Sequence, residues 1–221
     1  MINSVECQHL FASESVLIKR LFCDVKYPWD ILPCLGELIE GIISEGVDGY
    51  ELIADGVLAS KGARISPSAH VEGPAIIGDR CELRHGAYLR GSVILADGCI
   101  VGNSSEVKNS VLMEGASAPH FNYVGDSILG RRAHLGAGAI CSNLRSDEKP
   151  VKIHTEGGSI ETTLRKLGAI LADGAEIGCG AILCPGTVVG RCTTVYPLTL
   201  ARGTYPSDSI VKSTHTVVDK I

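Results

Sequence analysis

The chain has 221 residues and a formal net charge of −5, with 45% hydrophobic residues, only 5% aromatic residues and 26 glycines. This length suits one domain of good size with an appendage, and the composition favours thin, repetitive β layers over a thick globular core. The absence of a lysine or arginine run argues against a nucleic-acid partner, and no apolar stretch reaches the roughly 20 residues that a membrane span needs. Residues 1–6 lack the basic start of a signal peptide, so we expect a cytoplasmic protein with no membrane partner.

The cysteines point to the same compartment. There are nine, an odd number, and none forms a C-x-x-C motif. Cys81 and Cys99 occupy small-residue positions of the repeat described below, and Cys179 and Cys184 lack neighbouring histidines. We therefore expect reduced, small, buried cysteines, with no disulfide and no metal site.

Residues 1–60 show helical periodicity and are predicted to form an N-terminal helical cap. Ser13–Cys23 carries apolar residues at helical spacing, and Asp30 is placed to cap an amphipathic helix over Ile31–Ser44 whose first turn accommodates Pro33. A stack of β coils ends in unpaired N–H and C=O groups, so we expect this segment to cover that end.

From Ile65 an aliphatic or similar residue recurs every six positions, and most are followed four positions later by a small residue. The series is Ile65, Val71, Ile77, Leu83, Leu89, Leu95, Val101, Val107, Met113 and then Pro119. This hexapeptide pattern predicts a parallel β-helix over residues 61–204. Three hexapeptides form one triangular coil of about 18 residues, with the aliphatic side chains pointing inward.

Two departures interrupt the repeat. The stretch Pro119–Asp126 breaks the register and places His120 three residues before Tyr123. Residues 143–163 form a polar excursion, which predicts a functional loop or a disordered insert. The repeat resumes at Leu171, and residues 205–221 form a polar C-terminal tail. A break that carries titratable groups is the first place to look for chemistry.

One pair of cations follows from spacing alone. Arg90 and Lys108 are one coil apart, so they are expected to stack on the same face of the β-helix. Two such charges suit the binding of a phosphate group, although a solvated ladder of charges would show the same spacing.

At this point the sequence resembles a known family. Residues 76–203 are similar to the acetyltransferase half of bifunctional glucosamine-1-phosphate acetyltransferase/N-acetylglucosamine-1-phosphate uridylyltransferases, and to their archaeal-type sugar-1-phosphate nucleotidylyltransferase relatives. The resemblance implies a mainly β, left-handed parallel β-helix, a homotrimer and acetyl-CoA as co-substrate. The motifs that carry it are Leu89-Arg90-Gly91, Val101-Gly102-Asn103, Glu106-Val107-Lys108, His120–Asp126, Gly136–Arg145, Lys149 with Lys152, and Arg165–Ala169.

The resemblance also implies roles for single residues. His120 would be the general base, with Tyr123 and Asn143 beside the sugar and the acetyl group. Substrate contacts would come from Arg90, Lys108, Lys149, Lys152 and His134, and acetyl-CoA contacts from Gly136, Ala137, Gly138, Arg165 and Lys166. His134 stands where the bacterial family usually has an asparagine, which leaves open whether the amino sugar is glucosamine or galactosamine.

These residues suit acetyl transfer from a thioester to an amine, because a neutral imidazole can accept the proton that the amine loses. The expected reaction is N-acetylation of an amino-sugar 1-phosphate. No nucleotidyl transfer is expected, since nothing in the chain resembles that half of the family. A non-catalytic trimeric scaffold or regulator is the alternative. A zinc carbonic anhydrase of the same fold is disfavoured, because His120, His134 and His154 lack the spacing of its ligands.

Overall fold

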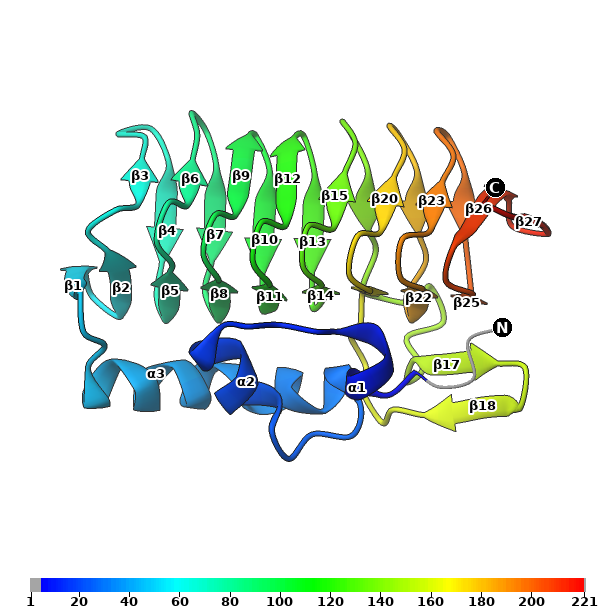
Figure 1. Cartoon of the computed structure of the whole chain (residues 1–221), viewed down its shortest axis with the longest axis horizontal. Coiled ribbons are helices and arrows are strands. Elements are labelled where there is room, and N and C mark those ends of the chain that lie inside the picture. The colour runs from blue at the N-terminus through cyan, green and yellow to red at the C-terminus, as the bar shows by residue number, and fades with distance from the viewer. Residues whose placement is uncertain (1–4, 221) are drawn as a thin grey trace.

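The computed structural model describes residues 5–220 and shows a triangular parallel β-helix with a helical layer along one side (Figure 1). The predicted fold class is confirmed: the chain is mainly β and its strands stack coil upon coil into three long sheets. The prediction that there is no signal peptide concerns residues 1–6, and residues 1–4 of that stretch lie outside the described residues.

The three sheets share no strand, and we call them sheets A, B and C. Sheet A contains, in spatial order, β1 (Tyr50–Ala54), β2 (Val57–Ser60), β5 (Ala75–Ile77), β8 (Val93–Leu95), β11 (Ser110–Leu112), β14 (Ile128–Leu129), β19 (Ala169–Leu171), β22 (Thr187–Val189) and β25 (Thr204–Tyr205). Sheet B contains β3 (Arg64–Ile65), β6 (Glu82–Leu83), β9 (Ile100–Asn103), β12 (Ser117–His120), β15 (His134–Leu135), β20 (Glu176–Ile177), β23 (Thr194–Val195), β26 (Ser209–Ser213) and β27 (Thr216–Asp219). Sheet C contains β4 (His70–Glu72), β7 (Tyr88–Arg90), β10 (Glu106–Lys108), β13 (Tyr123–Gly125), β16 (Ile140–Cys141), β21 (Ile182–Leu183) and β24 (Leu200–Ala201).

The inward-pointing residues follow the predicted series only as far as Val107. Ile77, Leu83, Leu89, Leu95, Val101 and Val107 belong to one buried interior cluster. The next inward residue is Leu112, five positions on, whereas Met113 packs on the outside of sheet A. Ala116 and Ala118, not Pro119, are the inward residues after Leu112. The predicted places of Met113 and Pro119 are therefore wrong, because the register shifts at Asn109, before the proposed break.

The register shift shortens the coils in the middle of the molecule. Tyr88 pairs with Glu106, 18 residues later, but Val93 pairs with Ser110 and Glu106 with Tyr123, each 17 residues later. The shorter coils have one residue fewer at the corner between sheets C and A. That corner turns through two left-handed residues at Gly91 and Ser92 but through one in the next coil, Asn109, with φ of 45°.

The N-terminal helices cover a side of the β-helix, not its end (Figure 1). They comprise α1 (Cys7–Leu10), α2 (Val16–Phe22), the 3₁₀ helix η1 (Pro28–Cys34) and α3 (Leu35–Glu45). Leu35, Ile39 and Ile42 of α3 are buried and join a cluster with the outward residues of sheet A, such as Ile76 and Ile94. Sheet A is apolar on both faces and therefore needs a cover, which corrects the predicted end cap. At the end itself, β1 pairs antiparallel with β2.

The helix predicted over Ile31–Ser44 is divided in two. Pro28 opens the 3₁₀ helix, which contains Pro33, and the α-helix begins only at Leu35. Pro33 has no N–H to donate to the carbonyl four residues earlier, so a tighter 3₁₀ helix precedes the regular α-helix.

The excursion at residues 143–163 is an ordered β-hairpin, so the expectation of a disordered insert is not met. It consists of β17 (Lys152–Thr155) and β18 (Gly158–Glu161), joined by a two-residue turn. Val151 and Ile153 are buried in the cluster under sheet A, and the hairpin continues the helical layer toward the C-terminal end (Figure 1). The tail also differs from the expectation, because β25 and β26 extend the coils through Ser213 and only β27 folds back.

The cysteines are all free, but only some of them are buried. Cys7, Cys81, Cys99 and Cys141 are buried as expected, whereas Cys23, Cys179 and Cys192 are exposed. Burial raises the pKa of the Cys7 and Cys141 thiols to about 12. No group of three or more His, Cys, Asp or Glu residues that could hold a metal ion occurs in residues 5–220. Across the same range, no helix has the length and apolar character needed to cross a membrane.

Candidate active site

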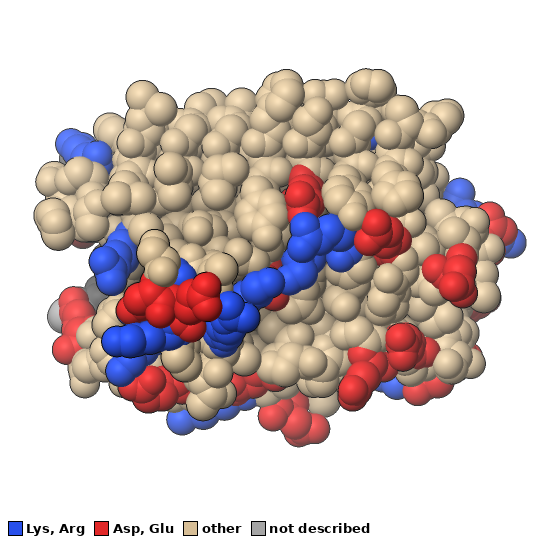
Figure 2. Space-filling model, turned by 180° about the vertical axis from the view of Figure 1, so that it is seen from behind, with Lys and Arg blue, Asp and Glu red and all other residues tan. Residues whose placement is uncertain are grey.

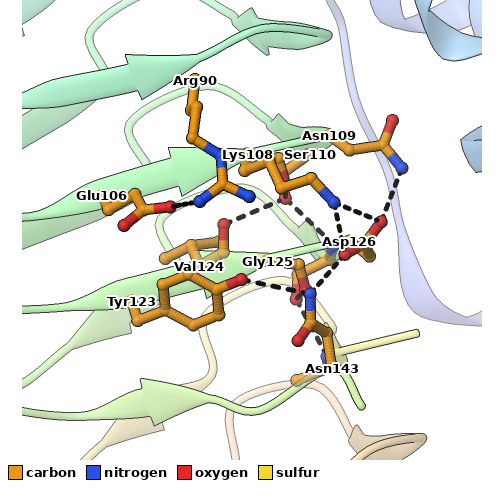
Figure 3. A network of polar contacts seen from close by, with 12 residues as sticks. Arg90, Glu106, Lys108, Asn109, Ser110, Tyr123, Val124, Gly125, Asp126 and Asn143 are labelled. Atoms are coloured by element: carbon orange, nitrogen blue, oxygen red, sulfur yellow. Dashed lines mark hydrogen bonds and ion pairs between the residues drawn. The ribbon is translucent and has the colours of Figure 1, made fainter. Parts of the chain in front are cut away.

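Four of the predicted site residues meet on the outer face of sheet C (Figure 3). Arg90 ends β7, Lys108 ends β10 and Tyr123 begins β13, and these three strands are neighbours. Asn143 follows β16, the next strand of the sheet. The amide Nδ2 of Asn143 donates to the Tyr123 hydroxyl at 3.2 Å. Spacing along the repeat thus brings residues 53 positions apart into one cluster.

Each of the two cations is paired with a carboxylate. Arg90 Nη1 donates to Glu106 Oε1 at 2.6 Å, and Lys108 Nζ lies 3.3 Å from Asp126 Oδ2. Arg90 and Lys108 lie on neighbouring strands, as predicted, but neither is a bare charge. Arginine has five N–H donors and lysine three, so both side chains retain donors for a second acceptor.

Asp126 is the hub of this cluster, although it was not among the predicted site residues. Only 4% of its surface is exposed, and its carboxylate accepts from Lys108, from Asn109 Nδ2 at 2.8 Å and, through a short contact, from Asn143 Nδ2. Asn109, Asp126 and Asn143 follow one another at intervals of 17 residues. A search for side chains spaced by 17 as well as 18 would have found this column.

Burial raises the pKa of Tyr123, and the nearby carboxylates Glu106 and Asp126 act in the same direction, against the hydrogen bond from Asn143. The phenol therefore remains protonated at neutral pH. Because its oxygen accepts from Asn143, its own hydrogen is available to donate to a ligand.

His120 lies at the corner between sheets B and C. It ends β12 beside Asn103 of β9, and two corner residues, Phe121 and Asn122, separate it from Tyr123. Its side chain is exposed and has no hydrogen-bond partner among residues 5–220. An imidazole in this state is accessible to a substrate proton.

The backbone around His120 is held by a buried side chain. Asn122 is 3% exposed; its Oδ1 accepts from the His120 N–H at 3.0 Å, and its Nδ2 donates to the carbonyls of Gly136 at 2.8 Å and Ala139 at 3.1 Å. The Gly138 N–H also donates to the His120 carbonyl at 2.9 Å. The predicted cofactor residues Gly136, Ala137 and Gly138 thus form the corner of the coil next to His120.

The remaining predicted residues lie apart from this cluster. His134 is on β15 of sheet B, where its Nδ1 and Ser117 Oγ are 2.9 Å apart. Lys149 is exposed on the excursion, and Arg165, just after it, forms an ion pair with Glu148 at 2.9 Å. Lys166 forms a backbone bridge with Leu144, beside Asn143, but its exposed side chain has no hydrogen bond or ion pair with the Arg90–Asn143 group among the described residues.

Lys152 lines a separate pocket of about 370 Å³ beside the hairpin. Arg145, His154 and Arg202 also line it, with Asp147 as the acidic member. Arg145 donates to Asp147 through two nitrogens and holds the pKa of that carboxyl well below its usual range. Three cationic side chains and one carboxylate line the pocket, and Glu161 pairs with Lys152 at 2.5 Å beside it, so the lining itself suits an anion.

Charge is unevenly distributed on the face opposite to that of Figure 1. Charged side chains gather in a belt across its middle and lower part, while the upper part bears almost none (Figure 2). Along the corner between sheets B and C and on sheet C, several large apolar side chains are exposed to solvent. They are Phe121 (61% exposed), Ile182 (44%), Leu198 (84%) and Leu200 (53%).

Comparison with known proteins supports the expected resemblance. No family model matches the chain. It is 36% identical over 178 residues to the bifunctional protein GlmU of Methanococcus maripaludis, covering 79% of this chain and 43% of that protein. It is 40% identical over 87 residues to a bifunctional sugar-1-phosphate nucleotidylyltransferase/acetyltransferase of Sulfurisphaera tokodaii, covering 39% of this chain and 22% of the relative. The chain therefore spans less than half the length of these relatives.

Among solved structures, the chain is similar to a perosamine N-acetyltransferase variant from Caulobacter crescentus in complex with CoA and GDP-perosamine. The TM-score is 0.35 and the sequence identity 17%, over 70% of this chain and 51% of that chain.

Proposed function

We propose that the protein transfers the acetyl group of acetyl-CoA to the amine of an amino-sugar 1-phosphate, glucosamine 1-phosphate or galactosamine 1-phosphate. The observation that carries this proposal is the cluster of Arg90, Lys108, Tyr123 and Asn143 on sheet C, next to the corner that bears His120. Its two cations suit a phosphate, and its phenol and amide suit sugar hydroxyls. The similarity to bifunctional proteins with an acetyltransferase half supports the same reaction class.

In this proposal His120 is the general base. The substrate amine attacks the thioester carbonyl and forms a C–N bond, while His120 accepts the proton that the nitrogen loses. Collapse of the tetrahedral intermediate breaks the C–S bond, and CoA leaves as a thiolate that takes up a proton. A base of this kind contributes roughly 10²–10⁴-fold to the rate.

The backbone N–H of Ala137 is assigned to the acetyl-CoA thioester, because this corner adjoins His120 in the next coil and the N–H groups of Gly136 and Gly138 already donate to the Ile177 and His120 carbonyls. The phosphates of CoA are assigned to the pocket lined by Arg145, Lys152, His154 and Arg202, where positive charge is in excess. Arg165 and Lys166 lie on the segment that follows the hairpin and would add to this positive charge.

We further propose a homotrimer that buries the apolar side chains at the corner between sheets B and C. Exposed Phe121, Leu198 and Leu200 form a surface that a lone chain would leave in water. A trimer would also bring a second subunit near His120, since Phe121 is its neighbour, and could supply a partner for His134.

Sedimentation equilibrium or light scattering tests the assembly. The expected mass is three times 23.3 kDa, and Leu198→Glu should shift the protein toward monomers because it buries a charge in the interface. Asp48→Lys, at an exposed position between α3 and β1, is the matched surface control and should leave the trimer intact. A monomeric wild-type protein at micromolar concentration would contradict this part of the proposal.

Acetyl transfer is tested by incubating the protein with acetyl-CoA and glucosamine 1-phosphate, galactosamine 1-phosphate or the unphosphorylated amino sugars. Product formation is best followed by chromatography, because the exposed Cys23, Cys179 and Cys192 would react with a thiol reagent. The proposal expects turnover with at least one 1-phosphate and little with the free sugars. Turnover with none of them, alongside an intact fold, would favour the non-catalytic alternative.

A further inference from the structure

We propose that Asp126 is a positioning residue, which fixes the side chains of Asn143 and Lys108 toward the amino-sugar phosphate. This inference rests on the proposed function for the identity of the substrate. The geometry that supports it is independent of that function. The carboxylate is nearly buried at the corner between sheets C and A and accepts from three side chains of the two neighbouring coils, Lys108 and Asn109 in the coil before it and Asn143 in the coil after it (Figure 3).

The place of the carboxylate is fixed by the backbone on both sides. The Asp126 N–H donates to the Lys108 carbonyl at 2.9 Å, and the Asp126 carbonyl accepts from the Gly168 N–H at 2.8 Å. Asp126 has φ of 48°, a left-handed conformation that aspartate and asparagine tolerate better than most residues. The backbone that carries the carboxylate is therefore held in place from both neighbouring coils.

The carboxylate determines which way the Asn143 amide faces. An ionised carboxylate can only accept hydrogen bonds, so the NH₂ group of Asn143 must be the end that points to Asp126. The same NH₂ group donates to the Tyr123 hydroxyl at 3.2 Å. As a result, Asn143 Oδ1 is turned away as a free acceptor, and the Tyr123 hydrogen is left free as a donor (Figure 3).

Lys108 is held by a weaker contact to the same group. Its Nζ lies 3.5 Å from Oδ1 and 3.3 Å from Oδ2 of Asp126, and its side chain is only 20% exposed. This attraction restricts a long, flexible side chain without using all three of its hydrogens. Asp126 thus prearranges one cation, one acceptor and one donor on the face where the sugar phosphate is proposed to bind.

The first test is structural and does not depend on turnover. Asp126→Asn preserves side-chain size and tolerates the left-handed backbone, but it presents an NH₂ group to two amide donors and an ammonium. In a crystal structure of this variant, the Asn143 amide should rotate and the Lys108 ammonium should leave position 126. Unchanged positions of both side chains would overturn the inference, whatever reaction the protein catalyses.

The second test is kinetic. Asp126→Asn should raise KM for the amino-sugar phosphate about tenfold or more, while KM for acetyl-CoA stays within about twofold. Asn109→Gly is the matched control: it removes another donor to the same carboxylate, and glycine suits the φ of 45° at that position. This control should leave both KM values unchanged. An equal effect of both variants, or a loss of thermal stability with an unchanged acceptor KM, would show a purely structural role.

A double-mutant cycle identifies the intermediary. If Asp126 acts through Asn143, then Asp126→Asn should have a much smaller effect on acceptor KM in an Asn143→Ala background than in the wild type. Additive effects would contradict the coupling. Failure of the proposed function gives a different result, namely a wild-type protein with no acetyl transfer to any amino-sugar phosphate, and the crystal structures still decide the role of Asp126 in that case.

Discussion

At the scale of single residues, buried polar side chains at the corners of the coils hold the candidate catalytic groups. Asn122 connects the His120 backbone to the Gly136–Ala139 corner, and Asp126 connects three coils at the opposite edge of sheet C. Both residues are almost fully buried. Such groups are costly to leave unpaired, so their replacement has consequences that exposed residues lack.

Asn122→Ala should destabilise the protein by about 2–3 kcal/mol, because it leaves one buried N–H and two buried carbonyls without their partner. The measurement is the free energy of unfolding in urea. Asn103→Ala, one coil earlier, removes a half-buried side chain that donates to the His85 carbonyl and accepts from the exposed Ser104 hydroxyl, and should cost less than about 1 kcal/mol. Equal losses in the two variants would show that Asn122 has no special bridging role.

The candidate site could be predicted in part from the sequence. Arg90 and Lys108 lie on neighbouring strands as their spacing indicates, because residues one full coil apart occupy equivalent positions on neighbouring strands. Asp126 was not predicted as a site residue, because the coil shortens to 17 residues at the corner before it. The six-residue repeat of apolar positions does not show that a corner has one residue fewer. The pairing of each cation with a carboxylate also depends on rotamers, which spacing does not specify.

At the scale of secondary-structure elements, the helical layer is attached to the β-helix by apolar packing and by the carboxylates of Asp173 and Glu114, of which Asp173 accepts from the Ala12 N–H at 2.8 Å. Glu114, which follows β11, accepts from Ser13 Oγ at 2.8 Å, the Glu14 N–H at 3.1 Å and the Ser15 N–H at 2.9 Å. Ser15 is the N-cap of α2, so the negative charge lies at the positive end of that helix.

Glu114→Gln should destabilise the protein by about 1–2 kcal/mol at pH 7. Burial alone would raise the pKa of Glu114, but the hydrogen bonds outweigh it and hold that pKa below its usual value. A carboxyl with a lowered pKa in the folded state stabilises the protein above its unfolded pKa, and this contribution is lost as the pH falls through the folded value. The difference between variant and wild type should therefore shrink below about pH 4.

The pH series of unfolding free energies checks this expectation. Glu156→Gln, on the exposed turn of the hairpin, removes the same charge without such contacts and should change stability by less than about 0.5 kcal/mol at any pH. If the loss of unfolding free energy in Glu114→Gln persisted unchanged at low pH, the contact would depend on the shape of the side chain and not on its charge.

The helical layer illustrates which element-scale features the sequence contains. The amphipathic pattern of Leu35, Ile39 and Ile42 is visible in the sequence, but not the surface that it covers. That surface could have been inferred from the strands of sheet A, since Ala75–Ile77 and Val93–Leu95 are apolar at every position, a pattern typical of strands buried on both faces. The end of the stack, by contrast, needs only the short antiparallel strand β1.

At the scale of the whole molecule, a rigid stack of coils carries the groups of the proposed acceptor site on and beside sheet C. His120 lies at one border of this sheet and Asp126 with Asn143 at the other, and Arg90, Lys108 and Tyr123 lie between them. The fold class was predictable because each coil repeats the same constraint. The exposure of Leu198 was not predictable, because an exposed leucine and a buried one look the same in a hexapeptide pattern.

The central claim is that His120 is the base for N-acetylation, and one comparison tests it most directly. His85 and His120 occupy the same exposed corner two coils apart, with Asn103 between them. In steady-state assays with acetyl-CoA and the best amino-sugar 1-phosphate, His120→Ala should lower kcat about 10²–10⁴-fold while the KM values change little, and His85→Ala should retain wild-type kcat. An unchanged kcat in His120→Ala would contradict the account.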